Sequence, residues 1–135
     1  MPSSAWSLQQ AIFAVISTDP PLLALLGGPH IYDDVPQPVS HPYLTLGQSI
    51  SRDWSSVGDT GEEHIITLHV WSRASGRKQT HQIMSAAREA LHDRVLALAG
   101  HRLINLRHEF SDARREPDGD TYHGLVRFRA VTEPL

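Results

Sequence analysis

Hydrophobic and polar positions alternate most regularly between residues 62 and 71 of this chain. Successive side chains of a β-strand point to opposite faces, so a period of two predicts a strand here. One face would carry His64, Ile66, Leu68 and Val70, and the other Ile65, Thr67, His69 and Trp71. Both faces are largely apolar. Such a strand lies inside a sheet, or is covered by a helix on one face and by a second subunit on the other.

The rest of the chain divides into strand and helix patterns. Residues 43–48, 101–110 and 122–132 have the alternation of strands. Residues 75–94 have the apolar spacing of the main helix, and an earlier helix begins at Ser3 or Ser4. A short second turn of helix follows Pro20 and ends at Gly27.

The order helix, strand, strand, helix, strand, strand (α-β-β-α-β-β) predicts an α+β fold. We expect a mostly antiparallel four-stranded sheet with helices packed on one face. At 135 residues, the whole chain (1–135) is expected to form a single domain. Polar loops at residues 49–61 and 111–120 would close its two hairpins, and both are longer than most hairpin loops.

Composition narrows the possible environments and partners. With 12 Lys plus Arg against 15 Asp plus Glu, the net charge of -3 gives no general attraction to nucleic acid. The chain has no cysteine, which excludes disulfides, thiolate zinc sites and cysteine nucleophiles. No apolar run reaches the roughly 18 residues of a membrane span, and no secretory signal is visible. We therefore expect no membrane partner and assembly in a cytoplasm.

Reactive groups do not converge in the sequence. The nine histidines do not have metal-ligand spacing: His64 and His69 would face opposite ways on one strand, and His81 and His92 would lie three turns apart on one helix. Adjacent carboxylates on a strand, such as those of residues 62 and 63, also point apart. We expect no catalytic residue, no metal and no cofactor, and hence that the protein is not an enzyme.

Basic residues give a local signal. Arg127 and Arg129 recur at period two on the last strand, and Arg107 would lie near them on the adjacent strand. They would form a positive stripe on the sheet face turned away from the helices, and this stripe could contact DNA. The alternative is an ordinary solvated face, on which nearby acidic residues pair with these arginines.

The two long loops are candidate contacts for partner proteins, because loops often carry recognition. Arg52 and Trp54 lie in the first loop, and Arg114 and Arg115 lie at the tip of the second. Tryptophan is enriched among interface hot spots, so Trp54 is a candidate anchor. Its alternative role is a lid on the core of its own domain.

Several segments, taken in order, resemble one family across nearly the whole chain. They are LQQAIFAVISTDPPLLALLGG, IYDDVPQ, HPYLTLG, GEEHIITLHVWSR, GRKQTHQIMSAAREAL, LAGHRLINLRHEFSDARREPDG and HGLVRFRAVTE. Together they look like the tail-completion, or tail terminator, proteins of long-tailed phages and of the gene transfer agents of alphaproteobacteria. Each segment alone is a weak signal, because none holds a catalytic group; their order and spacing are the more specific feature.

The resemblance implies a virion protein of the tail or neck that assembles in the bacterial cytoplasm. It would form a homo-oligomeric ring, usually of six subunits, on the head-proximal end of the tube made by the major tail tube protein. The ring would stop tube growth and bind a head-side neck or stopper protein, and double-stranded DNA would pass through its lumen. The alternative functions are another head–tail joining protein, such as a stopper or adaptor, and a small protein-binding module.

A ring would also account for apolar residues on the face turned away from the helices. Ile65, Trp71 and Leu125 would lie on that face and need cover, which a neighbouring subunit could supply. The alternative is that the helix following Pro20 folds over them. These three residues are the predicted subunit interface.

Overall fold

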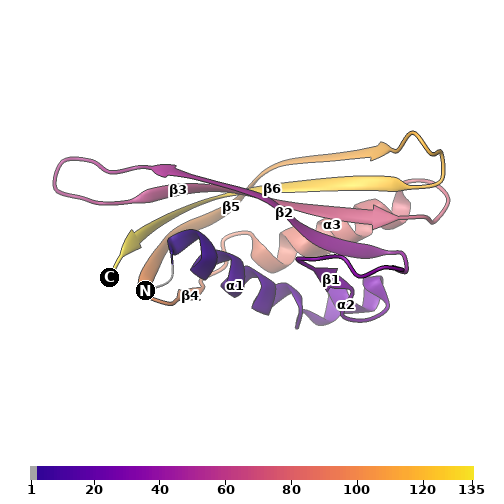
Figure 1. Ribbon diagram of the computed structural model, residues 1–135, viewed down its shortest axis with the longest axis horizontal. Helices are drawn as coiled ribbons and strands as arrows, with labels where there is room; N and C mark the ends of the chain where they lie inside the picture. The colour runs from indigo at the N-terminus through magenta and orange to yellow at the C-terminus, as the bar shows by residue number, and fades with distance from the viewer. Residues whose placement is uncertain (1–2) are drawn as a thin grey trace.

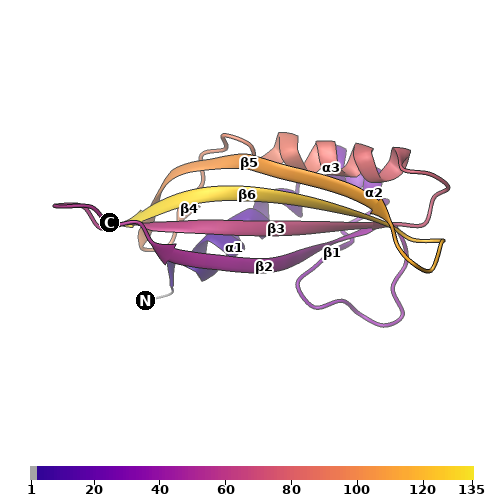
Figure 2. The same cartoon turned by 90° about the horizontal axis from the view of Figure 1, so that it is seen from above.

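The computed structural model describes residues 3–135 as one curved sheet with helices on one side (Figure 1). The strands are β1 (Ile31–Tyr32), β2 (Tyr43–Asp53), β3 (Glu62–Ser72), β4 (Ala97–Leu98), β5 (His101–Arg115) and β6 (Tyr122–Pro134). They form a six-stranded sheet in the order β1-β2-β3-β6-β5-β4 (Figure 2). β1 runs parallel to β2, and all other neighbours are antiparallel.

The predicted four-stranded sheet with the order α-β-β-α-β-β is therefore wrong. Residues 3–135 form a mixed sheet of six strands with three helices, and more of these residues are in strands than in helices. β1 and β4 have two residues each, which is too short for an alternating pattern to be visible. β1 also begins a segment, residues 31–42, that is rich in proline, and prolines disfavour the interior of a sheet.

Two strands are longer than predicted, and the loops between them are shorter. β2 continues to Asp53 and β5 to Arg115. The added segments, residues 49–53 and 111–115, are mostly exposed, so they lack an apolar face that would mark them as strands. Backbone pairing with β3 and β6 holds them instead, and only residues 54–61 and 116–121 remain outside the strands.

The helices are α1 (Ser4–Ile16), α2 (Pro20–Leu26) and α3 (Lys78–Leu91), which is shorter than the predicted helix 75–94 and has no side-chain cap at its start. Local signals in the sequence set the limits of the other two helices. The Ser3 hydroxyl accepts the Trp6 N–H at the start of α1, and the Asp19 carboxylate accepts the Leu22 N–H at the start of α2. Gly27 ends α2 in the left-handed region at φ 77°. None of the helices in residues 3–135 has the length and apolar character that crossing a membrane would require.

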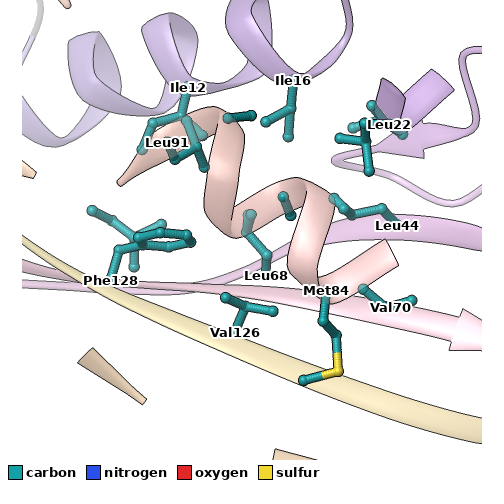
Figure 3. Close-up of a cluster of buried hydrophobic side chains, with 14 of the residues drawn as sticks. Ile12, Ile16, Leu22, Leu44, Leu68, Val70, Met84, Leu91, Val126 and Phe128 are labelled. Carbon is teal, nitrogen blue, oxygen red and sulfur yellow. The ribbon is translucent and has the colours of Figure 1, made fainter. Parts of the chain in front are cut away.

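The core lies between the sheet and the helices (Figure 3). The buried side of α3 packs on β6, β5 and β3, and α1 packs on α3. The fully buried residues of this core include Phe128 and Leu68 from the sheet and Ile12 and Leu91 from the helices. This packing covers one face of the sheet and leaves the other without a helix.

Candidate functional site

The side of the sheet that carries no helix is called the open face below. Its side chains come from the four long strands, as the register of β2, β3, β6 and β5 requires. They are Tyr43, Thr45, Ile50 and Arg52 of β2; Glu63, Ile65, Thr67, His69 and Trp71 of β3; His123, Leu125, Arg127 and Arg129 of β6; and Arg107, Phe110, Asp112 and Arg114 of β5.

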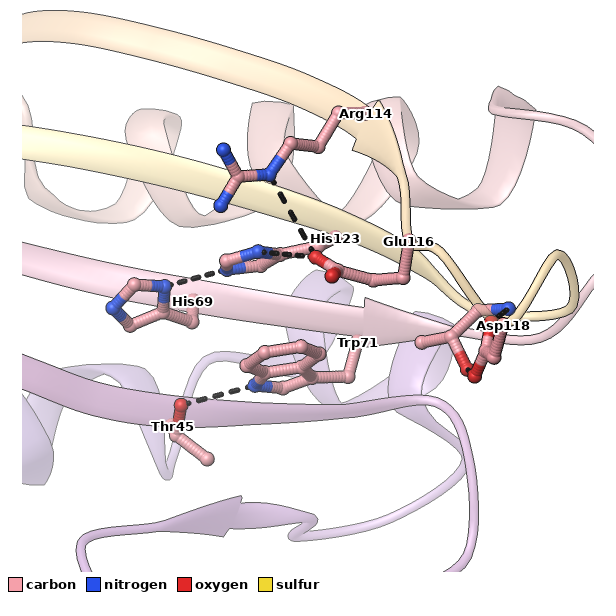
Figure 4. A network of polar contacts seen from close by, with 8 residues as sticks. Thr45, His69, Trp71, Arg114, Glu116, Asp118 and His123 are labelled. Carbon is pink, nitrogen blue, oxygen red and sulfur yellow. Dashed lines mark hydrogen bonds and ion pairs between the residues drawn. The ribbon is translucent and has the colours of Figure 1, made fainter.

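Stacked rings occupy one end of the open face (Figure 4). The Trp71 ring lies almost parallel to the His123 ring, with centroids 4.0 Å apart, and stacks more loosely on Tyr43 at 6.3 Å. Its indole N–H donates to the Thr45 hydroxyl over 3.2 Å. The His69 ring continues the stack, 4.8 Å from the His123 ring. Trp71 is thus held on three sides by its own chain.

The two stacked histidines belong to a short hydrogen-bonded chain. His69 Nδ1 lies 2.6 Å from His123 Nε2, and His123 Nδ1 lies 2.9 Å from a Glu116 carboxylate oxygen. Burial lowers the pKa of both histidines, although Glu116 acts in the opposite direction on His123. Neutral rings satisfy all three groups when His69 donates to His123 and His123 donates to Glu116. These two hydrogen bonds connect the turn after β5 to the two central strands of the sheet.

An ion-pair cluster occupies the other end of the open face. The Glu63 carboxylate is almost fully buried and accepts hydrogen bonds from Arg52 and, over 2.6 Å, from Arg129. These hydrogen bonds lower the pKa of Glu63, and the one from Arg52 has the largest effect. The Arg129 guanidinium also lies 4.9 Å from the centroid of the Trp54 ring.

The predicted positive stripe lies on the open face, but most of its charge is paired. Arg129 is bound by Glu63, and Arg107 lies 3.3 Å from an Asp93 carboxylate oxygen. Arg127 differs, because its buried Nε has no hydrogen-bond partner among the described residues. Its guanidinium lies 5.4 Å from the centroid of the Phe110 ring. A role of these arginines at DNA stays a prediction.

The residues of the predicted subunit interface also lie on the open face. Ile65, Trp71 and Leu125 are half-buried by neighbours on the same face. The most exposed large apolar side chains are other residues: Trp6, Phe13, Ile50, Trp54, Val57, Val95, Ile104, Phe110 and Leu135. Of these, Ile50 and Phe110 lie on the open face, in its two outer strands, and the rest lie at turns, near chain or strand ends and on the outside of α1. A subunit contact through the three predicted residues stays a prediction.

The placement of the predicted contact loops needs correction. Arg52 is in β2, and Arg114 and Arg115 are the last two residues of β5, so these three arginines lie in strands. Trp54 follows β2 directly, and its ring is 52% exposed beside Arg129. The polar composition that indicated loops instead marks the exposed ends of strands, and of the two hairpins the β2–β3 hairpin projects beyond the helices (Figure 1). Their contact with partner proteins remains untested.

Sequence reasoning did not find the His69, His123 and Glu116 chain or the buried Glu63. The histidines are 54 positions apart, and only the β3–β6 register brings them together. An acidic residue inside an apolar strand was the available signal for Glu63, since a buried carboxylate needs cationic partners. Within residues 3–135, no three His, Asp or Glu side chains are arranged to hold a metal ion.

Comparison with known proteins gives three findings. The family described as tail completion protein gp17 matches residues 10–133 of the chain. The tail completion protein gp17 of Bacillus phage SPP1 is 23% identical over 123 residues, which is 91% of this chain and 90% of that protein. A chain in a solved structure of the virion of a native gene transfer agent particle is 30% identical. It covers 98% of this chain and 99% of its own length with a TM-score of 0.90.

Proposed function

Because this chain belongs to the tail completion protein gp17 family, we propose that it forms a ring at the head-proximal end of a tail tube. It is a structural component of the tail of a phage or gene transfer agent virion, and its role is in tail joining. In the proposed ring it stops growth of the tube and presents the surface that binds a head-side neck protein. Double-stranded DNA passes through the lumen.

The likeness to the virion chain carries this proposal. At 30% identity and a TM-score of 0.90, the two chains share an architecture over almost their full lengths. The contacts that this domain makes in a particle are made through its own surface. The surfaces available are the open face, the two sheet edges and the two hairpins.

The charge pattern of the open face suits the wall of a DNA channel. Free cations on the wall would bind phosphates and slow the passage of DNA. Here Arg52 and Arg129 share Glu63, and Arg114 lies 3.7 Å from Glu116. We therefore place the open face toward the lumen, with paired arginines that weaken rather than hold the contact with DNA.

This placement competes with the predicted contact through Ile65, Trp71 and Leu125. Those residues share the open face with Arg127 and Arg129, so a neighbour that covered them would also cover the arginines. Replacing Leu125 with Glu separates the two possibilities. A lumen-facing position should tolerate the charge and still form rings, whereas a covered position should lose assembly because an unpaired charge would be buried.

Electron microscopy of particles with and without the gene product tests the function itself. We expect the chain in a ring between tube and neck. In its absence we expect tails of uncontrolled length that are not joined to heads. Tails of normal length that still join heads would contradict the proposal. Location of the chain on the head side of the neck would instead indicate a stopper or adaptor.

A further inference from the structure

The outer edge of β2 is half covered and half bare. β1 pairs with β2 only at Leu44 and Thr45. Beyond that point, no strand in residues 3–135 pairs with the outer side of residues 48–53, and all six are exposed. Bare edges invite pairing with another chain, and proteins usually block them. This chain blocks one half and leaves the other half open.

The outer edge of β5 is also half covered, at its opposite end. β4 pairs with His101 and Arg102. The turn after α3 then covers the next stretch, since the Asp93 N–H donates to the Leu106 carbonyl and the His108 N–H donates to His92 Nδ1. No such cover exists among the described residues for 110–115, which are exposed except for a half-buried Ala113.

The two bare segments lie at diagonally opposite corners of the sheet (Figure 2). The bare part of β2 is beside the β2–β3 hairpin, whereas the bare part of β5 is beside the β5–β6 hairpin. Because the four long strands alternate in direction, β5 of one copy would be antiparallel to β2 of the next copy. One chain therefore carries both halves of a head-to-tail contact.

We propose that residues 49–53 of one copy pair as an antiparallel strand with residues 111–115 of the next copy. This inference rests on the proposed ring, and it names the surface through which the ring closes. The partner is a second copy of this chain, because its two bare segments lie on opposite edges of the sheet, run in opposite directions and carry complementary charges. An exposed apolar side chain stands in each segment: Ile50 and Phe110, both 47% exposed.

Charge selects the register. Open-face side chains must stay on the open face, so Arg52 can lie opposite Phe110, Asp112 or Arg114 of the next copy. Asp112 is the complementary choice, since opposite charges across a strand pair are favourable and like charges are not. This register also places Ser51 opposite Ala113 and Asp53 opposite Ser111.

The stagger that this register demands is that of a closed barrel. Within one copy, Arg52 pairs with Glu63 of β3, whereas Asp112 pairs with Leu125 of β6, which pairs with His69 of β3. Placing Arg52 opposite Asp112 therefore shifts the next copy by the distance from residue 63 to residue 69, about six residues or ~20 Å along the strands. Four strands spaced ~4.8 Å apart occupy ~19 Å. The ratio of this shift along the strands to the width of the four strands corresponds to a strand tilt of about 45°, which closed barrels adopt. The diagonal placement of the bare segments is thus the one that ring closure needs.

Disulfide trapping tests the contact, because the chain contains no cysteine of its own. The variant Ser51→Cys with Ala113→Cys should, on oxidation of the purified protein, alone or bound to tail tubes, give a ladder of linked copies up to a closed ring. Asp53→Cys with Ser111→Cys tests the same register with side chains that are not in the core. In the control Ser51→Cys with Asp112→Cys, the second thiol lies on the opposite face and should not link.

The outcomes separate this contact from the function. Rings seen by native mass measurement in which neither matched pair links would overturn the edge contact and leave the ring. Linked dimers from Ser51→Cys alone would show a two-fold β2–β2 contact and overturn it as well. A chain that stays monomeric even with tail tubes would contradict the ring itself.

Discussion

Replacing Gly124 with Ala tests how closely α3 packs on β6. A Cβ atom at this position would lie 2.6 Å from Met84 Sδ and 2.9 Å from both Met84 Cγ and Thr80 Cγ2. Apolar atoms prefer separations of about 3.5–4.0 Å, so α3 or its side chains would have to move by roughly 1 Å. Met84 is only 5% exposed and Thr80 is fully buried, which leaves little room for that movement.

The expected cost is that of overpacking a core, about 1–3 kcal/mol. For a domain of this size, each kcal/mol lowers the melting temperature by about 4 °C, so the Gly124→Ala variant should melt roughly 4–12 °C lower. Thermal unfolding followed by circular dichroism at pH 7.5 measures the shift. The sign is informative, because the residue does not have a positive φ. Without a clash, Gly→Ala would stabilise by about 0.4–1 kcal/mol through the unfolded state.

A double variant identifies the cause. Met84→Ala removes the two closest atoms, so adding Gly124→Ala to it should cost much less than adding it to the natural chain. A coupling of about 1 kcal/mol or more between the two positions is expected. Unchanged or increased stability of the single Gly124→Ala variant would refute the close packing of α3 on β6.

Three further changes test the open face and its neighbours. Burial lowers the pKa of His64 below its ordinary 6.5, so the unfolded chain binds a proton more readily than the folded one. The free energy of unfolding should therefore fall as the pH drops below about 6.5, and His64→Gln should weaken this dependence. Equal melting temperatures of the natural chain at pH 7.5 and 5.5 would contradict this prediction. Glu63→Gln removes the shared partner of two arginines, so the assembled protein should melt lower and retain duplex DNA more strongly at low salt, whereas the exposed Glu109→Gln control should do neither. Trp54→Ala should keep the melting temperature within a few degrees, because its ring rests on Arg129 at the surface, but should reduce the fraction of tails joined to heads; large unfolding would show instead that Trp54 is a lid on the core.

The sequence predicted the segments whose side chains decide their structure. Residues 62–71 became β3 because both of their faces are buried or half-buried, and the apolar stripe of α3 lies in the core. The predicted number and order of strands were wrong because β1 and β4 have two residues each and are held by backbone pairing, which leaves no pattern of side chains to read. Residues 49–53 were missed for the same reason, since their side chains are exposed and only the backbone pairing with β3 makes them a strand.

Side-chain parity within one strand was also readable, but the register between strands was not. Parity placed Ile65 and Trp71 of one strand on the same face, as the structure has them. It could not show that Tyr43 and His123 stack on Trp71, because these residues come from two other strands. Trp71, which from the alternation within its own strand was expected to need cover by another subunit, is therefore partly covered by residues of the neighbouring strands.

In the proposed ring, contact through the strand edges would leave the open face free. The hydrogen bonds of the bare β2 and β5 segments would then close the ring, and the open face, whose side chains are partly covered by its own rings and ion pairs, would line the lumen. The arginines remain close to the lumen, but Arg129 and Arg107 are bound to Glu63 and Asp93, so repeating them around a ring adds little attraction for phosphate. In such a ring Arg127 would recur once per copy as the open-face arginine without a carboxylate partner among residues 3–135, and its contact with DNA would depend on salt rather than on sequence.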